Sequence, residues 1–227
     1  MSEPVLGVLM LETGFPRPPG DIGNPASFTH RVIYRTLPGA IVSTIVTDQP
    51  LPDVLVSQFV NEAKALERAG ATIITTSCGF LSPLQHHLQD AVEVPVITSS
   101  LWLIPHVRNL IGHDATIGIA TFDAASLSAH HIPDEGPVVV EGLKPEDHLF
   151  QVIKNNLPHL DQHKAQDDFD RLIERLFARK ADISALIIEC TNMPPYIDKH
   201  LKSLTIPIYD ILDGIKHLQN VDKMHVN

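Results

Sequence analysis

The chain has 227 residues, of which 44% are hydrophobic and 19% are charged, and its formal net charge at pH 7 is −10. This length and composition suit one large α/β unit or two smaller lobes, each with its own hydrophobic core. The acidic balance, with no cluster of Lys and Arg, excludes nucleic acid as an expected partner, because phosphate contacts require a basic surface.

In the first half of the chain, apolar β-branched runs alternate with stretches of helical period. The predicted elements are a strand Val5–Glu12, a Pro- and Gly-rich loop, a strand Ala40–Val46, a helix Asp53–Gly70, a strand Thr72–Thr76, a helix Pro83–Ala91, a strand Pro95–Thr98 and a helix Ser99–Ile111. Asp53 is placed to cap its helix and Gly70 to end it. The first apolar run is too short to span a bilayer and has no positive flank, so we expect a cytoplasmic protein without a membrane partner.

The second half continues the same alternation. Its predicted elements are strands Ala115–Ala120 and Val138–Glu141, a helix Pro145–Leu157, a helix that starts near Asp167, a strand Ala185–Glu189, a helix Pro194–Ser203, a strand Ile206–Tyr209 and a terminal helix. Strands that are regularly separated by helices predict βαβ units with parallel sheets and right-handed crossovers.

The two cysteines of the chain occur in matching contexts. Cys78 and Cys190 each end an apolar run, and a Pro inside a short apolar strand follows each of them by 17 positions, at Pro95 and Pro207. Each cysteine is also followed within four or five positions by a Pro suited to the first turn of a helix. This repeat predicts two similar Rossmann-like α/β lobes, the first formed by 1–98 plus 210–227 and the second by 99–209.

The predicted position of the cysteines is chemically useful. Ligands of parallel α/β sheets bind beyond the carboxyl ends of the strands. A thiol between such a strand and a helix N-terminus is expected to have a lowered pKa. Two facing lobes would place Cys78 and Cys190 on opposite sides of one ligand in the cleft, where one thiolate removes a proton next to a carboxylate and the other thiol returns one to the opposite face.

The carbanion of such a reaction needs hydrogen-bond donors for its carboxylate. Near the thiols, the sequence offers Thr76, Ser77 and Gly79 in the first lobe, and Thr191 and Asn192 in the second. Arg17 and Arg31, in the loop after the first strand, are interpreted as ordinary solvated arginines. Asn24 lies in the same loop, which would cover the cleft, and is a further candidate for substrate contact.

Two α/β lobes with cysteines after equivalent strands resemble the aspartate/glutamate racemase superfamily, which includes hydantoin racemases, maleate isomerases and arylmalonate decarboxylases. The pair Cys190-Thr191 matches the second motif of its amino-acid racemases. The resemblance covers nearly the whole chain. It implies chemistry without pyridoxal phosphate or metal, with Cys78 and Cys190 as the acid/base pair, and a C-terminal segment that returns to the first lobe. It also implies that Thr121 contacts the substrate carboxylate and that the protein forms a homodimer.

The chain departs from the superfamily pattern at both motifs. Gly79 and Phe80 follow Cys78 where Asn-Thr is usual, and Phe80 is expected to make the pocket more apolar. Glu189 precedes Cys190 where Gly is usual, and Asn192 stands where Glu or His is usual. Because adjacent residues of a strand face opposite ways, we interpret Glu189 as structural. These departures count against free aspartate or glutamate as the substrate.

We therefore predict a cofactor-independent racemase or epimerase of a small carboxylate-bearing substrate such as an amino acid or a hydantoin. The alternatives are a cysteine-dependent cis–trans isomerase of the maleate type, a decarboxylase, and a non-catalytic binding protein of the same shape. The 13 histidines include adjacent pairs such as His130-His131 but no HExxH spacing, so we interpret them as surface residues and predict no metal site. The candidate substrate-binding residues are Asn24, Thr76, Ser77, Gly79, Phe80, Thr121, Thr191 and Asn192.

Overall fold

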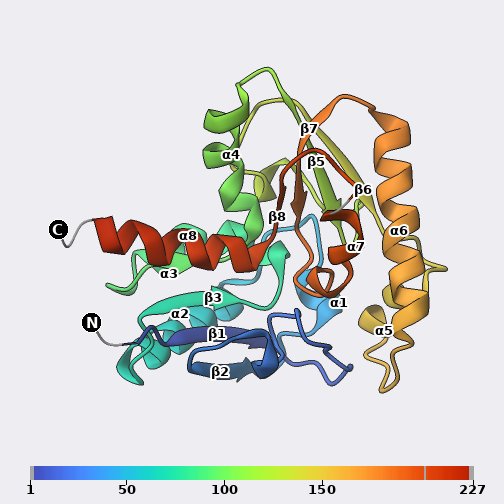
Figure 1. The fold of residues 1–227 in the computed structure, drawn as a ribbon. Helices are drawn as coiled ribbons and strands as arrows, with labels where there is room; N and C mark the ends of the chain where they lie inside the picture. The colour runs from blue at the N-terminus through green and yellow to red at the C-terminus, as the bar shows by residue number, and fades with distance from the viewer. Residues whose placement is uncertain (1–2, 202, 225–227) are drawn as a thin grey trace.

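The computed structural model describes residues 3–201 and 203–224 and contains two four-stranded parallel sheets flanked by helices (Figure 1). The strand order is β2-β1-β3-β4 in the first sheet and β6-β5-β7-β8 in the second, so the two sheets have the same topology. The predicted fold class is therefore confirmed.

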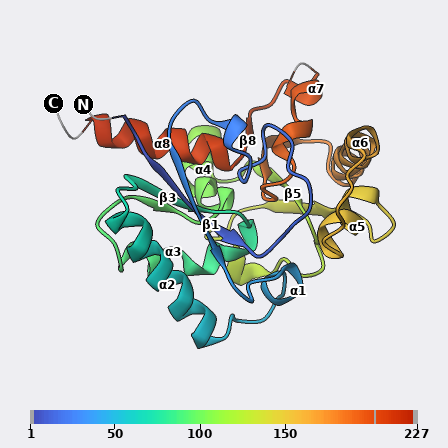
Figure 2. The same cartoon turned by 90° about the horizontal axis from the view of Figure 1, so that it is seen from below.

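The strands of the first sheet lie within the first 97 residues of the chain. Its strands are β1 (Leu6–Leu11), β2 (Val32–Leu37), β3 (Ile73–Thr76) and β4 (Val96–Ile97). Helix α2 (Asp53–Arg68) contacts β1 and β2, while α8 (Ile211–Met224) contacts β3 and β4. Figure 2 shows α2 and α8 on opposite faces of this sheet. The described part of the C-terminal segment thus returns to the first sheet.

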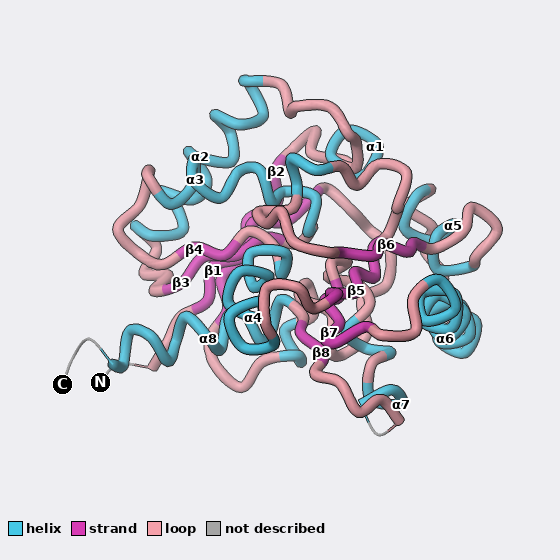
Figure 3. Tube along the Cα trace, turned by 90° about the horizontal axis from the view of Figure 1, so that it is seen from above, coloured by secondary structure: helices cyan, strands magenta, loops and turns pink. Residues whose placement is uncertain are grey.

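The second sheet lies between α4 and α6 (Figure 3). Its strands are β5 (Thr116–Thr121), β6 (Val138–Gly142), β7 (Ile183–Ile188) and β8 (Ile208–Tyr209). Helix α4 (Ile104–Ile111) contacts β7, and α6 (Gln162–Arg179) contacts β5 and β6. Strands β1 and β5 are entirely buried, as expected for parallel strands covered on both faces.

Short helical segments connect these elements. They are η1 (Pro25–Ser27), α1 (Val42–Ile45), η2 (Gly79–Leu84), α3 (Gln85–Gln89), η3 (Ser100–Leu103), η4 (Ala129–His131), α5 (His148–Lys154), η5 (Pro194–Tyr196) and α7 (Asp198–Leu201). Several predicted helices thus contain, or consist of, short 3-10 turns. Within the described residues, no helix is long and apolar enough to cross a membrane.

The predicted strand Ala40–Val46 is wrong, because this segment contains helix α1 and the second strand of the sheet is β2. Val42, Ile45 and Val46 are buried, so this apolar run contributes to the core without pairing in the sheet. Strand β2 is an edge strand that pairs only with β1 among the described residues, and most of it is partly or fully exposed. Its mixed sequence therefore lacks the continuous apolar run typical of a central parallel strand.

Other boundaries also differ from the prediction. Asp53 is the first residue of α2, and Pro52 occupies the cap position without a side-chain bond. Helix α6 begins five residues before Asp167, at Gln162, with Asp161 as the cap whose carboxylate accepts from His163 and Lys164. The first turn of α6 lacks the apolar periodicity by which a helix is predicted from sequence. The proposed bounds of the two lobes remain a prediction.

Candidate active site

The two cysteines occupy equivalent positions of the two sheets. Cys78 follows the last residue of β3 by two positions, and Cys190 follows the last residue of β7 by two positions. Both β3 and β7 are the third strands of their lobes in chain order and lie next to the first strand. The duplicated sequence context therefore corresponds to duplicated structure.

Both cysteines line one cavity of about 360 Å³, a volume that includes the solvent at its mouth. The polar and sulfur-bearing lining residues are Thr13, Arg17, Ser77, Cys78, Glu189, Cys190, Thr191 and Asn192. The remaining lining residues are Leu11, Phe15, Val42, Val46, Gly79, Phe80, Phe122 and Ile153.

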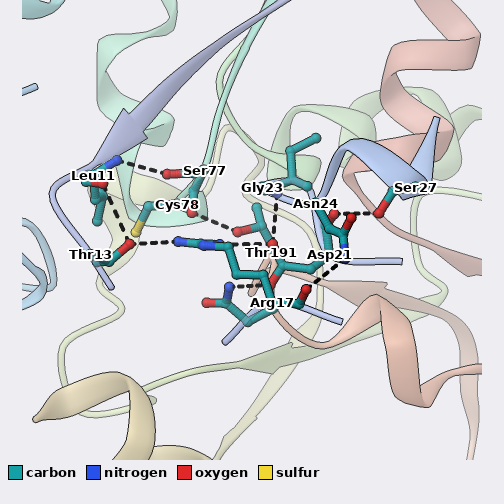
Figure 4. Close-up of polar contacts among 12 residues, drawn as sticks. Leu11, Thr13, Arg17, Asp21, Gly23, Asn24, Ser27, Ser77, Cys78 and Thr191 are labelled. Atoms are coloured by element: carbon teal, nitrogen blue, oxygen red, sulfur yellow. Dashed lines mark hydrogen bonds and ion pairs between the residues drawn. The ribbon is translucent and has the colours of Figure 1, made fainter. Parts of the chain in front are cut away.

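Buried hydroxyl groups bond to the backbone around this cavity, and one of these bonds joins the segments that carry the two cysteines. Thr191 Oγ1 donates to the Ser77 carbonyl oxygen at 2.7 Å, and Ser77 Oγ accepts from Leu11 N at 2.9 Å (Figure 4). Ser100 Oγ donates to the Ile188 carbonyl oxygen at 2.7 Å. The bond from Thr191 to Ser77 connects the segments that follow β7 and β3, and so helps to hold the two cysteines in place relative to each other.

The loop after β1 brings a guanidinium group to the cavity. Arg17 Nη1 donates to Asp21 Oδ1 at 2.8 Å, and Nη2 donates to Thr13 Oγ1 at 2.9 Å (Figure 4). Asn192 Nδ2 donates to the other oxygen of Asp21 at 2.7 Å. The Arg17 side chain is only 10% exposed, so its interpretation as a solvated arginine is wrong, whereas Arg31 is exposed as predicted.

Glu189 is a second correction, because its side chain lines the cavity. Its Oε2 accepts from Thr121 Oγ1 at 2.7 Å and from Phe122 N at 3.4 Å, whereas Oε1 is buried without a hydrogen-bond partner. The residue lies just beyond the end of β7, so the alternation of strand residues no longer directs its side chain. Burial raises the pKa of Glu189 from 4.5 to about 7, while the bonds from Thr121 and Phe122 lower it.

The expected lowering of the thiol pKa values is also wrong. Burial raises the pKa of both Cys78 and Cys190, and the carboxylate of Glu189 raises both further. The backbone N–H of Phe80 opposes the shift at Cys78, and that of Asn192 opposes it at Cys190. Only short 3-10 helices follow the thiols, and their dipoles are small compared with that of a long α-helix.

Five of the eight candidate substrate-binding residues line the cavity with the cysteines: Ser77, Gly79, Phe80, Thr191 and Asn192. The other three bond within the chain. Asn24 Nδ2 donates to the Arg17 carbonyl oxygen, Thr76 Oγ1 donates to the Thr98 carbonyl oxygen, and Thr121 donates to Glu189. Thr76 shapes the turn before Cys78, because its hydroxyl also bonds to the Cys78 backbone. Direct contact of these three with a substrate remains a prediction.

Apart from Gly79 and Phe80, sequence reasoning did not identify the apolar residues of the lining, nor that Arg17 lies in it. Leu11, Phe15, Phe122 and Ile153 reach the cavity through tertiary packing, which no local pattern reveals. Arg17 and Glu189 did carry a signal, since one is a charged residue in the loop over the cleft and the other is a departure from the motif.

The histidines mostly lie at the surface, as expected for His86 and His87, which are exposed. His131 is an exception, because it is 2% exposed and stacks edge-on against Phe80. Burial lowers its pKa from 6.5 to about 4. No group of three or more His, Cys, Asp or Glu side chains among the described residues is arranged to hold a metal ion.

No family model matches the chain, but curated relatives cover most of it. Dimethylsulfoniopropionate lyase from Durusdinium sp. clade D is 30% identical over 217 residues, which cover 91% of this chain and 71% of the relative. Dimethylsulfoniopropionate lyase 7 from Emiliania huxleyi is 29% identical over 224 residues, which cover 92% of this chain. The chain spans 64% of that relative, and so less than two thirds of its length.

Solved structures of the aspartate/glutamate racemase superfamily share the fold. Arylmalonate decarboxylase superposes with a TM-score of 0.58 at 15% identity, over 95% of this chain and 92% of that chain. Allantoin racemase from Klebsiella pneumoniae superposes with a TM-score of 0.58 at 12% identity, over 98% of this chain and 89% of that chain. These likenesses confirm the two-sheet fold that the resemblance to this superfamily implies.

The predicted activity is corrected by the same comparisons. The relatives that match most of the chain are named lyases, so the prediction of an isomerase that racemises its substrate is wrong. The prediction was wrong because it assumed that one cysteine removes a proton and the other returns a proton to the opposite face of the same carbon. Removal of a proton next to a carboxylate is also the first step of an elimination, which needs only one base.

Proposed function

The chain belongs to the family of the dimethylsulfoniopropionate lyases, and from this we propose that it is a lyase that eliminates a leaving group from the β-carbon of a small carboxylate. Dimethylsulfoniopropionate is the first substrate to test. The observation that carries the proposal is that both thiols line one cavity together with the guanidinium of Arg17.

The proposed reaction is a β-elimination. Dimethylsulfoniopropionate has a carboxylate on its α-carbon and a dimethylsulfonium group on its β-carbon. A thiolate removes one α-proton, the electrons of that C–H bond form the Cα–Cβ double bond, and the C–S bond breaks with its electrons. The products are acrylate, neutral dimethyl sulfide and a protonated thiol, so neither an oxidant nor a reductant is needed.

The cavity contains groups for each part of this step. The Arg17 guanidinium is the only Lys or Arg side chain in the cavity lining and binds the substrate carboxylate, which stabilises the negative charge that develops on deprotonation. Either Cys78 or Cys190 supplies the base, and the other remains a neutral thiol at the same cavity. Ser77, Thr191 and Asn192 provide further polar groups in the lining.

The raised pKa of the thiols favours a cationic substrate. Burial and the nearby Glu189 carboxylate disfavour a thiolate at both cysteines. A sulfonium group beside the thiol has the opposite Coulomb effect and lowers its pKa. An acidic amino acid would bring a second carboxylate to the cavity and raise the thiol pKa further.

The proposal is tested with purified protein and dimethylsulfoniopropionate. Headspace gas chromatography should detect dimethyl sulfide, and NMR should detect an equal amount of acrylate. Cys78→Ala and Cys190→Ala are compared, and the variant that lacks the base should lose about 10²–10⁴-fold in kcat/KM, the typical contribution of base catalysis. Replacement of either residue by Ala without any loss of dimethyl sulfide release would refute a role for that thiol.

Two further properties are proposed on the same basis. The free thiols Cys78 and Cys190 suit a reducing compartment, and we propose the cytoplasm. A homodimer, which members of the superfamily lead us to expect, is tested by sedimentation equilibrium. The proposed partner is a small-molecule carboxylate.

A further inference from the structure

The two departures from the superfamily motifs lie in contact with each other. Gly79 follows the first cysteine, and Glu189 precedes the second. A Cβ atom on Gly79 would overlap with Glu189 Oε1 and with the Glu189 carbonyl oxygen, so no side chain fits at this position. The glycine thus provides the space that the carboxylate fills.

This carboxylate is held in position from one side only. Thr121 Oγ1 and the backbone N–H of Phe122 both bond to Oε2, while Oε1 has no partner although it is buried. An unpartnered buried carboxylate oxygen is costly, so its presence at the wall of a binding cavity indicates a missing positive partner. No Lys or Arg side chain is hydrogen-bonded or ion-paired to Glu189 among the described residues.

We propose that the Glu189 carboxylate binds the positively charged leaving group of a zwitterionic substrate and so determines the specificity of the proposed elimination. This inference rests on the proposed elimination. In this proposal, the carboxylate of the zwitterion binds to Arg17 and its onium group binds to Glu189, and both residues line one cavity.

The surroundings of Glu189 fit an alkylated cation. An onium group has methyl groups and no N–H donor, so it binds by charge and by contact with aromatic faces. Phe80 and Phe122 line the same cavity as Glu189. Phe80 is 1% exposed and is held edge-on by His131, and Phe122 is stacked on Phe150, so both rings are fixed in place. A primary ammonium group would leave its three donors largely unsatisfied at this apolar wall.

The test compares two carboxylates that differ only in the charge of the β-substituent. The probes are 3-(trimethylammonio)propionate, which is cationic at the β-position, and 4,4-dimethylpentanoate, its isostere with a neutral tert-butyl group there. Their dissociation constants are measured at pH 8 by calorimetry for the wild type, Glu189→Gln and Glu189→Asp. Wild type should bind the cationic probe about 100-fold more tightly than the neutral one, as expected for charges ~5 Å apart at an effective dielectric constant of about 20.

Glu189→Gln should remove this preference through weaker binding of the cationic probe, while its affinity for the neutral probe changes less than about threefold. Glu189→Asp keeps the charge and should retain a reduced preference. A matched control is Glu141→Gln, which neutralises another buried carboxylate, one that is paired with Lys144 and Arg175 outside the cavity lining. This control should preserve the 100-fold ratio.

The outcomes separate this inference from the proposed elimination. A preference for the cationic probe that is lost in Glu189→Gln supports the role of Glu189, even if no dimethyl sulfide is released from dimethylsulfoniopropionate. Release of dimethyl sulfide by Glu189→Gln with unchanged KM, together with an unchanged preference between the two probes, would overturn the inference and leave the elimination standing.

Discussion

Glu189→Gln should change how the stability of the protein depends on pH. The pKa of Glu189 is raised from 4.5 to about 7, mainly by burial. The folded protein therefore holds this proton more tightly than the unfolded chain. The stabilising contribution of the protonated carboxyl is present in full below pH 4.5 and is lost as the pH rises through about 7.

The size of the effect follows from the two pKa values of Glu189. At about 1.4 kcal/mol per pKa unit, the change from 4.5 to about 7 is about 3 kcal/mol in the free energy of unfolding, and about 2.5 kcal/mol of it falls between pH 5 and pH 8. The side chain is 1% exposed, so solvent screening is small. The Gln variant cannot titrate, and its unpaired amide costs about 1–3 kcal/mol at every pH.

The assay is urea denaturation of wild type and Glu189→Gln at half-unit steps from pH 5 to pH 8. The difference between the two free energies of unfolding removes the contribution of other titrating groups, such as Asp210, whose pKa is raised to about 6. The measurement stops at pH 8 because ionisation of the two cavity thiols affects stability at higher pH.

The difference should move by about 2.5 kcal/mol in favour of the Gln variant as the pH rises from 5 to 8. A difference that stays constant within about 0.5 kcal/mol would show that Glu189 has an ordinary pKa in the folded protein. The carboxylate would then be hydrated, and the account of a buried and unpartnered oxygen would be refuted.

Three other substitutions test the site. Arg17→Gln should lower kcat/KM by about 10- to 100-fold, because it removes charge-assisted hydrogen bonds to the substrate carboxylate. The control Arg31→Gln, at an exposed position in the same loop, should leave the kinetics unchanged. Equal effects of the two substitutions would contradict the placement of the substrate carboxylate at Arg17. Gly79→Ala should destabilise the protein by about 2–3 kcal/mol in urea melts, because its Cβ would overlap Glu189, and a change below about 0.5 kcal/mol would argue against that contact. Thr191→Val should cost about 1 kcal/mol of stability by removing the bond to the Ser77 carbonyl, and an unchanged denaturation midpoint would show that this bond does not join the lobes.

Much of the fold is predictable from the sequence because its central strands are buried on both faces. Strands β1, β3, β5 and β7 appear as uninterrupted apolar or β-branched runs. The edge strand β2 is partly exposed and was missed, and the neighbouring run Ala40–Val46 is apolar because it packs in the core. Periodicity reports burial reliably, but it does not report which buried segments pair in a sheet.

The candidate site was predictable where it follows from the repeat. Cys78 and Cys190 lie just after equivalent strands, and their sequence neighbours Ser77 and Thr191 line the same cavity. The electrostatics were not predictable in the same way. The raised pKa values of the thiols depend on burial and on the position of Glu189, which are tertiary properties.

The activity could not be read from the thiol pair, because proton removal next to a carboxylate begins both racemisation and elimination. The sequence departs from the superfamily pattern at Gly79 and Glu189, among other positions, and the proposed role of Glu189 starts from that departure. The contact between Gly79 and Glu189 is seen only in the structure, because the two residues lie 110 positions apart in the chain.

The central claim is that Cys78 and Cys190 face one substrate cavity, and it is tested most directly by bridging them with dibromobimane, which becomes strongly fluorescent when both of its arms have reacted with thiols. At pH 9, the account predicts one bridging reagent per chain, identified by mass spectrometry as a Cys78–Cys190 crosslink, and slower reaction when 3-(trimethylammonio)propionate is bound. The addition of separate reagents to the two thiols, with no crosslink and no protection by this ligand, would contradict it.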